Sequence, residues 1–273
     1  MFGVVTRNAE ELDWPTFDRR CYEVKSVSGQ AREPIAAATS MISCHADTAA
    51  ADASPELVPV TEDGEIATRE RQYFDWGYVC PTHPDYREGL LETIADAADA
   101  SGDVRLDDVG FPRPEYCFCD RCVEQFEESA YDDRFAWRAS VVTEFVSEAA
   151  DQVGGDLSLT LHPDPYPGHL HGRSGLDLDA LSEYVDEFVV PLYDTAYGTT
   201  YWLESLASGF RDALDAPLAI ELYAVDVDIE NLVHAAEVAD AYATDVLFGY
   251  DASNAQAAIR RLNAETREGK SYG

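Results

Sequence analysis

The sequence has 273 residues, enough to bury a full core, and its 53 acidic residues against 19 basic ones give a formal net charge of −34 at pH 7. A charge of this sign and size repels nucleic acid and anionic membranes, so neither is an expected partner. Because 46% of the residues are hydrophobic and 11% are aromatic, we expect a packed fold and not acidic disorder.

The acidic surface has almost no lysine, since Lys25 and Lys270 are the only two in the chain. This composition is typical of proteins dissolved in molar salt, where the Debye length is about 3 Å and self-repulsion is screened. Residues Met1–Pro15 lack the basic and apolar parts of a signal peptide, and no apolar run approaches about 18 residues. We therefore expect a soluble, cytoplasmic, halophilic protein in a reducing cell such as that of a salt-loving archaeon.

Short apolar runs alternate with amphipathic stretches, a pattern that predicts parallel strands joined by crossover helices. The strand-like segments, in chain order, are Phe2–Thr6, Tyr22–Ser28, Ile35–Cys44, Val104–Phe111, Leu157–His162, Phe188–Tyr193, Pro217–Tyr223 and Asp245–Tyr250. The helical patterns are Glu10–Arg20, Tyr86–Ala100, Cys122–Gln152, Asp177–Glu187, Tyr201–Leu214, Ile229–Tyr242 and Ser253–Asn263. This count predicts an α/β fold with a single (β/α)8 TIM barrel over residues 1–273. An open doubly wound sheet is the alternative, but no G-x-G-x-x-G follows a strand.

The first three β/α units are irregular. Only residues 29–34 separate the second and third strands, which is too short for a crossover helix, so either that helix is lost or one of the strands is not real. Residues 46–73 are rich in Ala, Asp, Glu, Thr and Pro and show no periodicity. We predict a long loop or lid, residues 46–75, after the third strand.

Cysteines cluster in the sequence at Cys80 and in the run Cys117-Phe118-Cys119-Asp120-Arg121-Cys122. A C-x-C-x-x-C run is too tight for comfortable disulfides, whereas its three thiolates and Cys80 suit a tetrahedral Zn²⁺. Unpaired thiols, or a redox pair at Cys119 and Cys122, are the alternatives. In a barrel these residues lie on two neighbouring βα-loops, 80–122, at the face that carries active sites. Four sulfurs leave no open coordination position, so we expect a structural zinc.

Strand alternation predicts which polar side chains point into the barrel. Arg105 and Asp107 alternate with outward-facing Val104 and Leu106, and Ser158, Thr160 and His162 are inward by the same pattern. Asp107 could pair with Arg105 or Arg113 as a structural residue, and Asp108 is the inward carboxylate if the strand is bulged.

Glu221 and Tyr223 point inward on the seventh strand. A carboxylate inside a strand pattern is costly unless it is paired or used in chemistry. No nearby position supplies an Arg or Lys partner for Glu221, which favours a chemical role. We therefore predict Asp107 and Glu221 as the acid/base and nucleophile of glycosidic bond cleavage.

Further candidates for binding a substrate end strands or lie in loops on the same face. They are Arg105, His162, Tyr193, Asp194, Tyr223, Asp251 and Trp76. His162 could instead belong to a catalytic metal site with His169 and His171. Trp76, as an aromatic residue in or near a loop, suits stacking on a sugar ring, although aromatic side chains in such places also serve as rim packing.

Residues 76–126 resemble TIM-barrel glycoside hydrolases and hydrolase-like proteins. The residues that carry the resemblance are Trp76, Cys80-Pro81, His83-Pro84, Tyr86-Arg87-Glu88, Leu106-Asp107-Asp108-Val109-Gly110-Phe111-Pro112, the three clustered cysteines and Phe126. The cysteine pattern is similar to that of family 42 β-galactosidases. The Leu-Asp-x-Val-x-Phe-Pro run is similar to the end of the fourth strand in glycosyl-hydrolase barrels. The resemblance implies a barrel, a zinc and a carbohydrate ligand, with Glu221 at the position of the family's nucleophile.

The sequence also departs from that family. Family 42 enzymes carry an Asn-Glu pair after the fourth strand, and no such pair ends a strand here, so Asp107 does not inherit the acid/base role from the resemblance. The chain also lacks the family's accessory domains. A catalytically inactive barrel that binds carbohydrate or a protein is therefore one alternative function, and a metal-dependent hydrolase or isomerase is the other. The sequence does not indicate the sugar, the linkage or the oligomeric state.

The net charge predicts that folding requires salt. Moving the protein from molar to millimolar KCl removes the screening of acidic groups, so we expect loss of native circular dichroism and exposure of the core. A circular dichroism spectrum that is the same at both salt concentrations would contradict the halophilic assignment.

Overall fold

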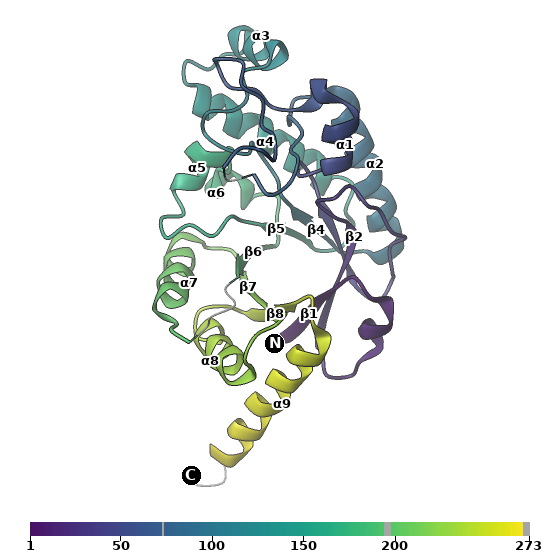
Figure 1. The fold of residues 1–273 in the computed structure, drawn as a ribbon, viewed down its shortest axis with the longest axis vertical. Helices are drawn as coiled ribbons and strands as arrows, with labels where there is room; N and C mark the ends of the chain where they lie inside the picture. The colour runs from purple at the N-terminus through teal and green to yellow at the C-terminus, as the bar shows by residue number, and fades with distance from the viewer. Residues whose placement is uncertain (73, 194–197, 270–273) are drawn as a thin grey trace.

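The chain forms a closed barrel of eight parallel strands that pair in sequence order, and β8 closes on β1 (Figure 1). The strands are β1 (Phe2–Thr6), β2 (Arg19–Lys25), β3 (Thr39–Ser43), β4 (Val104–Asp107), β5 (Leu157–Thr160), β6 (Glu187–Leu192), β7 (Leu218–Tyr223) and β8 (Asp245–Gly249). The structure is a computed structural model that describes residues 1–72, 74–193 and 198–269. The predicted (β/α)8 barrel is confirmed.

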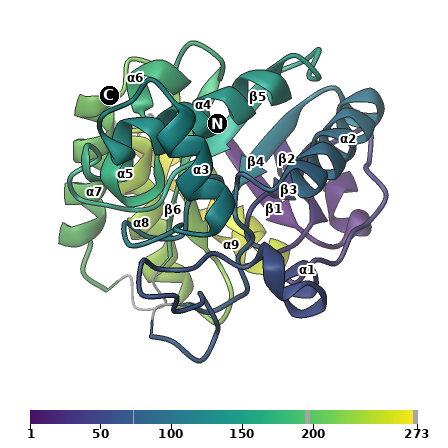
Figure 2. The same cartoon turned by 90° about the horizontal axis from the view of Figure 1, so that it is seen from above.

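Helices surround the barrel (Figures 1 and 2). They are α1 (Thr48–Ala53), α2 (Pro84–Ser101), α3 (Asp120–Glu128), α4 (Arg134–Ala150), α5 (His169–Ser174), α6 (Leu178–Leu181), α7 (Tyr201–Ala213), α8 (Ile229–Asp240) and α9 (Ala252–Gly269), with two short 3₁₀ turns, η1 (Ala9–Asp13) and η2 (Pro55–Leu57). Their apolar faces pack on the outward side chains of the strands and form the main hydrophobic core. No helix in the described ranges is long and apolar enough to span a bilayer.

Several predicted elements differ from the structure at their ends. The helix predicted over Glu10–Arg20 is only the 3₁₀ turn η1, and no helix lies between β2 and β3, where the crossover helix is lost. The predicted helix Cys122–Gln152 is two helices, because Ser129 ends α3 in an extended conformation and the Asp133 side chain accepts from Phe135 N to cap α4. Only Leu178–Leu181 of the predicted helix Asp177–Glu187 is helical.

The segment predicted as a long loop is not wholly irregular, because α1 and η2 lie within residues 48–57. Its return path, residues 77–79, runs against residues 45–47. Val79 N donates to His45 O, and Asp47 N donates to Gly77 O. This pairing brings the end of the loop back to the C-terminal ends of β3 and β4.

The barrel interior is layered. At the N-terminal end Arg19 of β2 forms ion pairs with Glu187 of β6 and Asp245 of β8. Above it lies a small apolar cluster of inward side chains, which comprises Val5, Cys21, Met41, Val189, Ala219 and Leu247. A second charged layer, built around Arg105 and Glu221, lies next along the strands. Polar and apolar layers therefore alternate along the barrel interior, and a cavity lined by Arg105 and Asp107 lies beyond the second charged layer.

Candidate functional site

Arg105 organises the upper charged layer. Its guanidinium contacts Glu221 Oε at 2.6 Å and donates from Nε to Asp107 and to Thr160 Oγ1, each at 2.8 Å. The side chains of Arg105 and Glu221 are 1% and 0% exposed. Burial alone would lower the pKa of Arg105, but the two carboxylates outweigh it and raise that pKa well above its ordinary value. The layer is therefore a buried ionic network across β4, β5 and β7.

The prediction that Glu221 has no basic partner is wrong. Arg105 is that partner, brought across the barrel lumen from β4 to β7. The Tyr193 hydroxyl also donates to Glu221 Oε1, and burial together with Glu221 raises the pKa of Tyr193. Gly249 of β8 leaves room for this carboxylate, because a Cβ there would lie 2.8 Å from Glu221 Oε1. The prediction that Arg105, Asp107 and Glu221 point inward is confirmed by these contacts.

A cavity of about 430 Å³ opens above this network. Asp107, Thr160 and Tyr193 contribute to its floor from three strand ends. Its walls include Trp76 and Tyr78, which directly follow the long loop, together with Asp75, Asp108, Arg113, His162, Arg173 and Tyr250. Glu221 does not line the cavity, but it contacts Arg105 and Tyr193, which do. In a TIM barrel the loops that follow the parallel strands meet at this face, where barrel enzymes have their active sites.

Asp108 faces the same cavity as Asp107 but has a different environment. The backbone of Asp108 leaves the strand with a φ of 54°, which ends the alternation and lets two successive carboxylates reach one space. Ser43 Oγ donates to Asp108 Oδ2 at 2.7 Å. Burial, followed by the negative charge of Asp107, raises the pKa of Asp108 to about 7. Asp108 therefore holds a proton in a substantial fraction of molecules at neutral pH.

The remaining predicted residues have four different outcomes. Trp76, His162 and Tyr193 line the cavity. The Tyr223 ring packs against the rings of Tyr193 and Tyr250 with centroids 5.3 Å and 6.4 Å apart. Asp251 accepts from Asn254 N at 2.9 Å and thus caps the first turn of α9. Asp194 lies outside the described residues.

The three histidines do not form a metal site in the described part of the chain, where the only cluster with metal-ligand geometry is the four cysteines. His169 contacts Asp164 at 3.4 Å and is mostly exposed. Burial and the nearby Arg173 lower the pKa of His162 to about 4, so its imidazole is neutral at pH 7.

Several cavity residues were not singled out as site residues from the sequence. Asp108 was considered only as an alternative, and its positive φ has no signal in the sequence. Arg173 and Tyr78 lie in segments without strand periodicity, so alternation says nothing of their direction. Tyr250 directly follows β8, and this position at a strand end was the one available signal.

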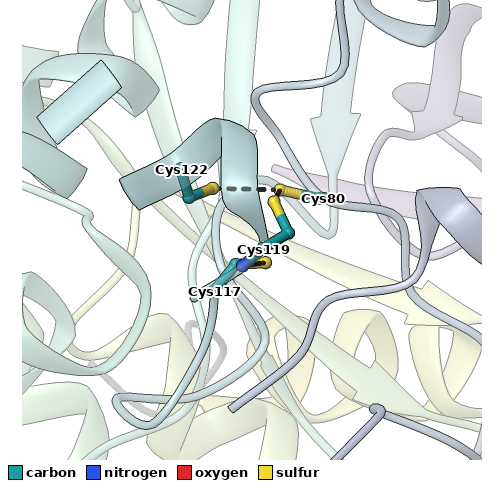
Figure 3. A group of neighbouring side chains, drawn as sticks. All are labelled: Cys80, Cys117, Cys119 and Cys122. Atoms are coloured by element: carbon teal, nitrogen blue, oxygen red, sulfur yellow. Dashed lines mark hydrogen bonds between the residues drawn. The ribbon is translucent and has the colours of Figure 1, made fainter. Parts of the chain in front are cut away.

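The four cysteines come together as predicted, from the βα-loops after β3 and β4 (Figure 3). Their sulfurs all lie within 4.8 Å of one another, with Cys80 Sγ 3.4 Å from Cys122 Sγ and 3.9 Å from Cys119 Sγ. These separations are too long for disulfides and match the roughly 3.8 Å between sulfurs around a tetrahedral metal with bonds of about 2.3 Å. Cys117 Sγ accepts from Val60 N and Cys119 N, each at 3.4 Å. The donor set thus fits a soft divalent metal.

The cysteine cluster is connected to the cavity through the long loop. Cys80 N donates to Leu57 O and Phe118 N donates to Val60 O, each at 2.7 Å, so both cysteine loops contact residues 57–60. From Tyr116, beside the cluster, an aromatic series runs through Phe74 to Tyr78, each pair of ring centroids 5.6 Å apart. Tyr78 lines the cavity. The cluster therefore supports one of the cavity walls.

The fold is that of TIM-barrel proteins, and comparison with solved structures gives the same class. The chain superposes on an α-L-fucosidase isoenzyme 2 from Paenibacillus thiaminolyticus with a TM-score of 0.67 at 11% identity, covering 100% of this chain and 50% of the fucosidase. It superposes on a family GH18 chitinase from Cycas revoluta with a TM-score of 0.54 at 10% identity, covering 97% and 99%. This chain is therefore half the length of the fucosidase chain that it matches. No family model and no curated protein matches the sequence.

The buried pair predicts a structural effect of replacing Glu221. Glu221→Gln removes one of the two carboxylates that neutralise Arg105, so we expect the free energy of unfolding to fall by about 3 kcal/mol, at the low end for a broken buried ion pair because Asp107 remains. Denaturant titration in molar KCl measures this change. Glu230→Gln is the matched control, since its ion pair with Arg261 is exposed and should contribute less than about 1 kcal/mol. Equal effects of the two substitutions would contradict the structural role.

Proposed function

We propose that this protein is a glycoside hydrolase that cleaves a carbohydrate in the cavity above Arg105. The observation that carries the proposal is the pair of carboxyl groups, Asp107 and Asp108, that line one cavity in different environments. Glycosidic bond cleavage needs one carboxyl group to give a proton and another to stabilise or attack the sugar carbon. The barrel fold shared with a fucosidase and a chitinase is consistent with this chemistry.

Asp108 takes the role of general acid in this proposal. Its pKa of about 7 keeps a proton available near neutral pH, and the proton passes to the leaving oxygen as the glycosidic bond breaks. Ser43 fixes one carboxyl oxygen and leaves the other for the substrate.

Asp107 is the carboxylate that faces the sugar carbon. Arg105 and Thr160 hold Asp107 Oδ1, which sets the direction of the carboxylate before substrate arrives. Glu221 is assigned here as a positioning residue that holds Arg105 and Tyr193 and does not touch the substrate, in place of the nucleophile role expected from the strand pattern. Trp76 and Tyr193 offer ring surfaces and a hydroxyl to the sugar, and His162 offers a neutral imidazole.

The metal proposed for the cysteine cluster is a structural Zn²⁺. Four sulfur ligands suit zinc and leave no position for water, so it supplies no chemistry to the reaction. Its proposed role is to hold the loops after β3 and β4 and, through residues 57–60, the wall that carries Trp76 and Tyr78. The acidic surface supports the further proposal that the protein works in a cytoplasm of high salt.

The pH dependence tests the acid role. The protonated form of Asp108 is the active one, so kcat/KM should fall tenfold per pH unit above about pH 7, as that proton is lost. A screen of chromogenic glycosides in multimolar KCl supplies the substrate. Asp108→Asn should lower kcat by about 10²-fold or more and abolish the alkaline limb. Asp75→Asn is the control, a cavity carboxylate without an assigned role. A normal pH profile in Asp108→Asn would contradict the assignment, and binding without turnover would favour the inactive barrel.

The zinc proposal predicts about one Zn²⁺ per chain in protein purified without chelator, measured by elemental analysis. Cys119→Ser should lose the metal and lower the thermal midpoint, because the free energy of metal binding contributes to folding. Cys21→Ala, in the barrel interior, should keep the metal. A folded wild-type protein without metal would contradict the proposal.

A further inference from the structure

Two arginines line one side of the cavity, and their positive charge suits a negatively charged group. Arg113 comes from the loop between β4 and α3, and Arg173 comes from the last turn of α5. Both also line an adjoining cavity of about 470 Å³. They therefore belong to the wall that the two cavities share.

Arg173 is available to a ligand. Acidic residues outnumber basic ones by 53 to 19 in this chain, yet no carboxylate of the described residues forms an ion pair with Arg173. Arg113 differs, since it shares its charge with Glu115 at 2.8 Å in a largely exposed pair. A half-buried guanidinium that lines a cavity and has no ion pair with a described carboxylate is suited to bind an external anion.

The position of Arg173 is fixed by the backbone around it. The buried Arg138 donates from Nη1 to Gly172 O at 2.9 Å and from Nη2 to Arg173 O at 3.0 Å. The same guanidinium donates to Arg113 O at 2.8 Å. Arg138 thus clamps the backbones of Arg113 and Arg173 together and holds the two cavity arginines in a fixed relation, which reduces the entropy lost when an anion binds.

The other charges of the cavity fix where an anion can lie. Arg105 also lines the cavity, but Asp107 and Glu221 already neutralise its charge. Asp75 and the ionised fraction of Asp108 repel an anion from that part of the cavity. His162 is neutral at pH 7 and supplies a hydrogen bond without charge. The protein's net charge does not prevent binding in molar salt, because a Debye length of about 3 Å leaves only direct contacts. An anionic group is thus directed to the arginine wall while the rest of the ligand lies toward the carboxylates.

We propose that the cavity binds a sugar with an acidic substituent, a carboxylate or a sulfate, whose charge is held by Arg173 with Arg113. The identity of the ligand as a sugar rests on the proposed function. The planar guanidinium matches the paired oxygens of either anion and binds them by two parallel hydrogen bonds. This contact orients the ring with its anomeric carbon away from the arginines and toward Asp107 and Asp108.

Binding measurements test the proposal independently of turnover. The probes are glucuronate and galacturonate, their uncharged methyl esters, and glucose and galactose 6-sulfates with the neutral sugars, titrated by calorimetry at constant KCl concentration. We expect the wild type to bind at least one acidic probe about tenfold or more tightly than its neutral counterpart. Whether the uronates or the 6-sulfates show the larger preference identifies the acidic group as a carboxylate or a sulfate. Equal binding of every charged and neutral pair would overturn the proposal.

Substitution locates the effect. Arg173→Gln should remove the preference for the acidic probe, Arg173→Lys should restore part of it, and Arg260→Gln, the same change of charge on exposed α9, should leave it intact. Arg113→Gln, which should weaken the preference, serves as the second variant if circular dichroism shows that Arg173→Gln is unfolded. An acidic preference that survives in the folded variants would overturn the site.

Different results would contradict the acidic-sugar site and the glycosidase function. Acidic sugars that bind through Arg173 without hydrolysis of any acidic glycoside would uphold this site and contradict the glycosidase function. Hydrolysis of neutral glycosides at a rate unchanged in Arg173→Gln, with no acidic probe bound, would uphold the glycosidase function and overturn this site.

Discussion

The ion pair between Arg105 and Glu221 is the constraint on which the site depends. Burying two charges in the lumen carries a desolvation cost of several kcal/mol per ion, which is recovered only when each charge has a close partner. Asp107, Thr160 and Tyr193 complete the network, so strands β4 to β7 must keep their register for it to form. The charged layer therefore fixes the positions of the strand ends, and these positions determine the shape of the cavity above them.

The sequence was sufficient to predict the barrel because the barrel follows from local patterns. Periodicity located all eight strands, and alternation placed Arg105, Asp107 and Glu221 inside. The cysteine spacing placed the four-cysteine cluster on two neighbouring loops for the same reason, since loops after consecutive strands must meet at one face. The misjudged elements were η1, α6 and the break between α3 and α4. At that break the Asp133 cap starts a new helix within one apolar pattern.

The partner of Glu221 could not be found by looking near it in the sequence. Alternation gives the direction of a side chain but not the facing residue across a closed barrel, which depends on the strand stagger. The pattern placed Arg105 and Glu221 inside independently, and only closure brings them into contact. Asp108 illustrates a second limit, because its turn out of the strand is a single dihedral angle with no signal in composition or spacing. The residues that define the chemistry thus depend on tertiary geometry more than those that define the fold.

The two carboxylates of the cavity differ because the same network acts on them unequally. Asp107 contacts Arg105 directly, whereas Asp108 has no ion pair among the described residues, accepts a hydrogen bond from Ser43 and meets the charge of Asp107. Burial then raises the pKa of Asp108 to about 7. Arg105 fixes Asp107, whereas the proton on Asp108 is retained because burial and the charge of Asp107 outweigh the opposite effect of Arg105 on the pKa of Asp108. The proposed division of roles between Asp107 and Asp108 thus depends on which of the two carboxylates contacts the buried guanidinium of Arg105.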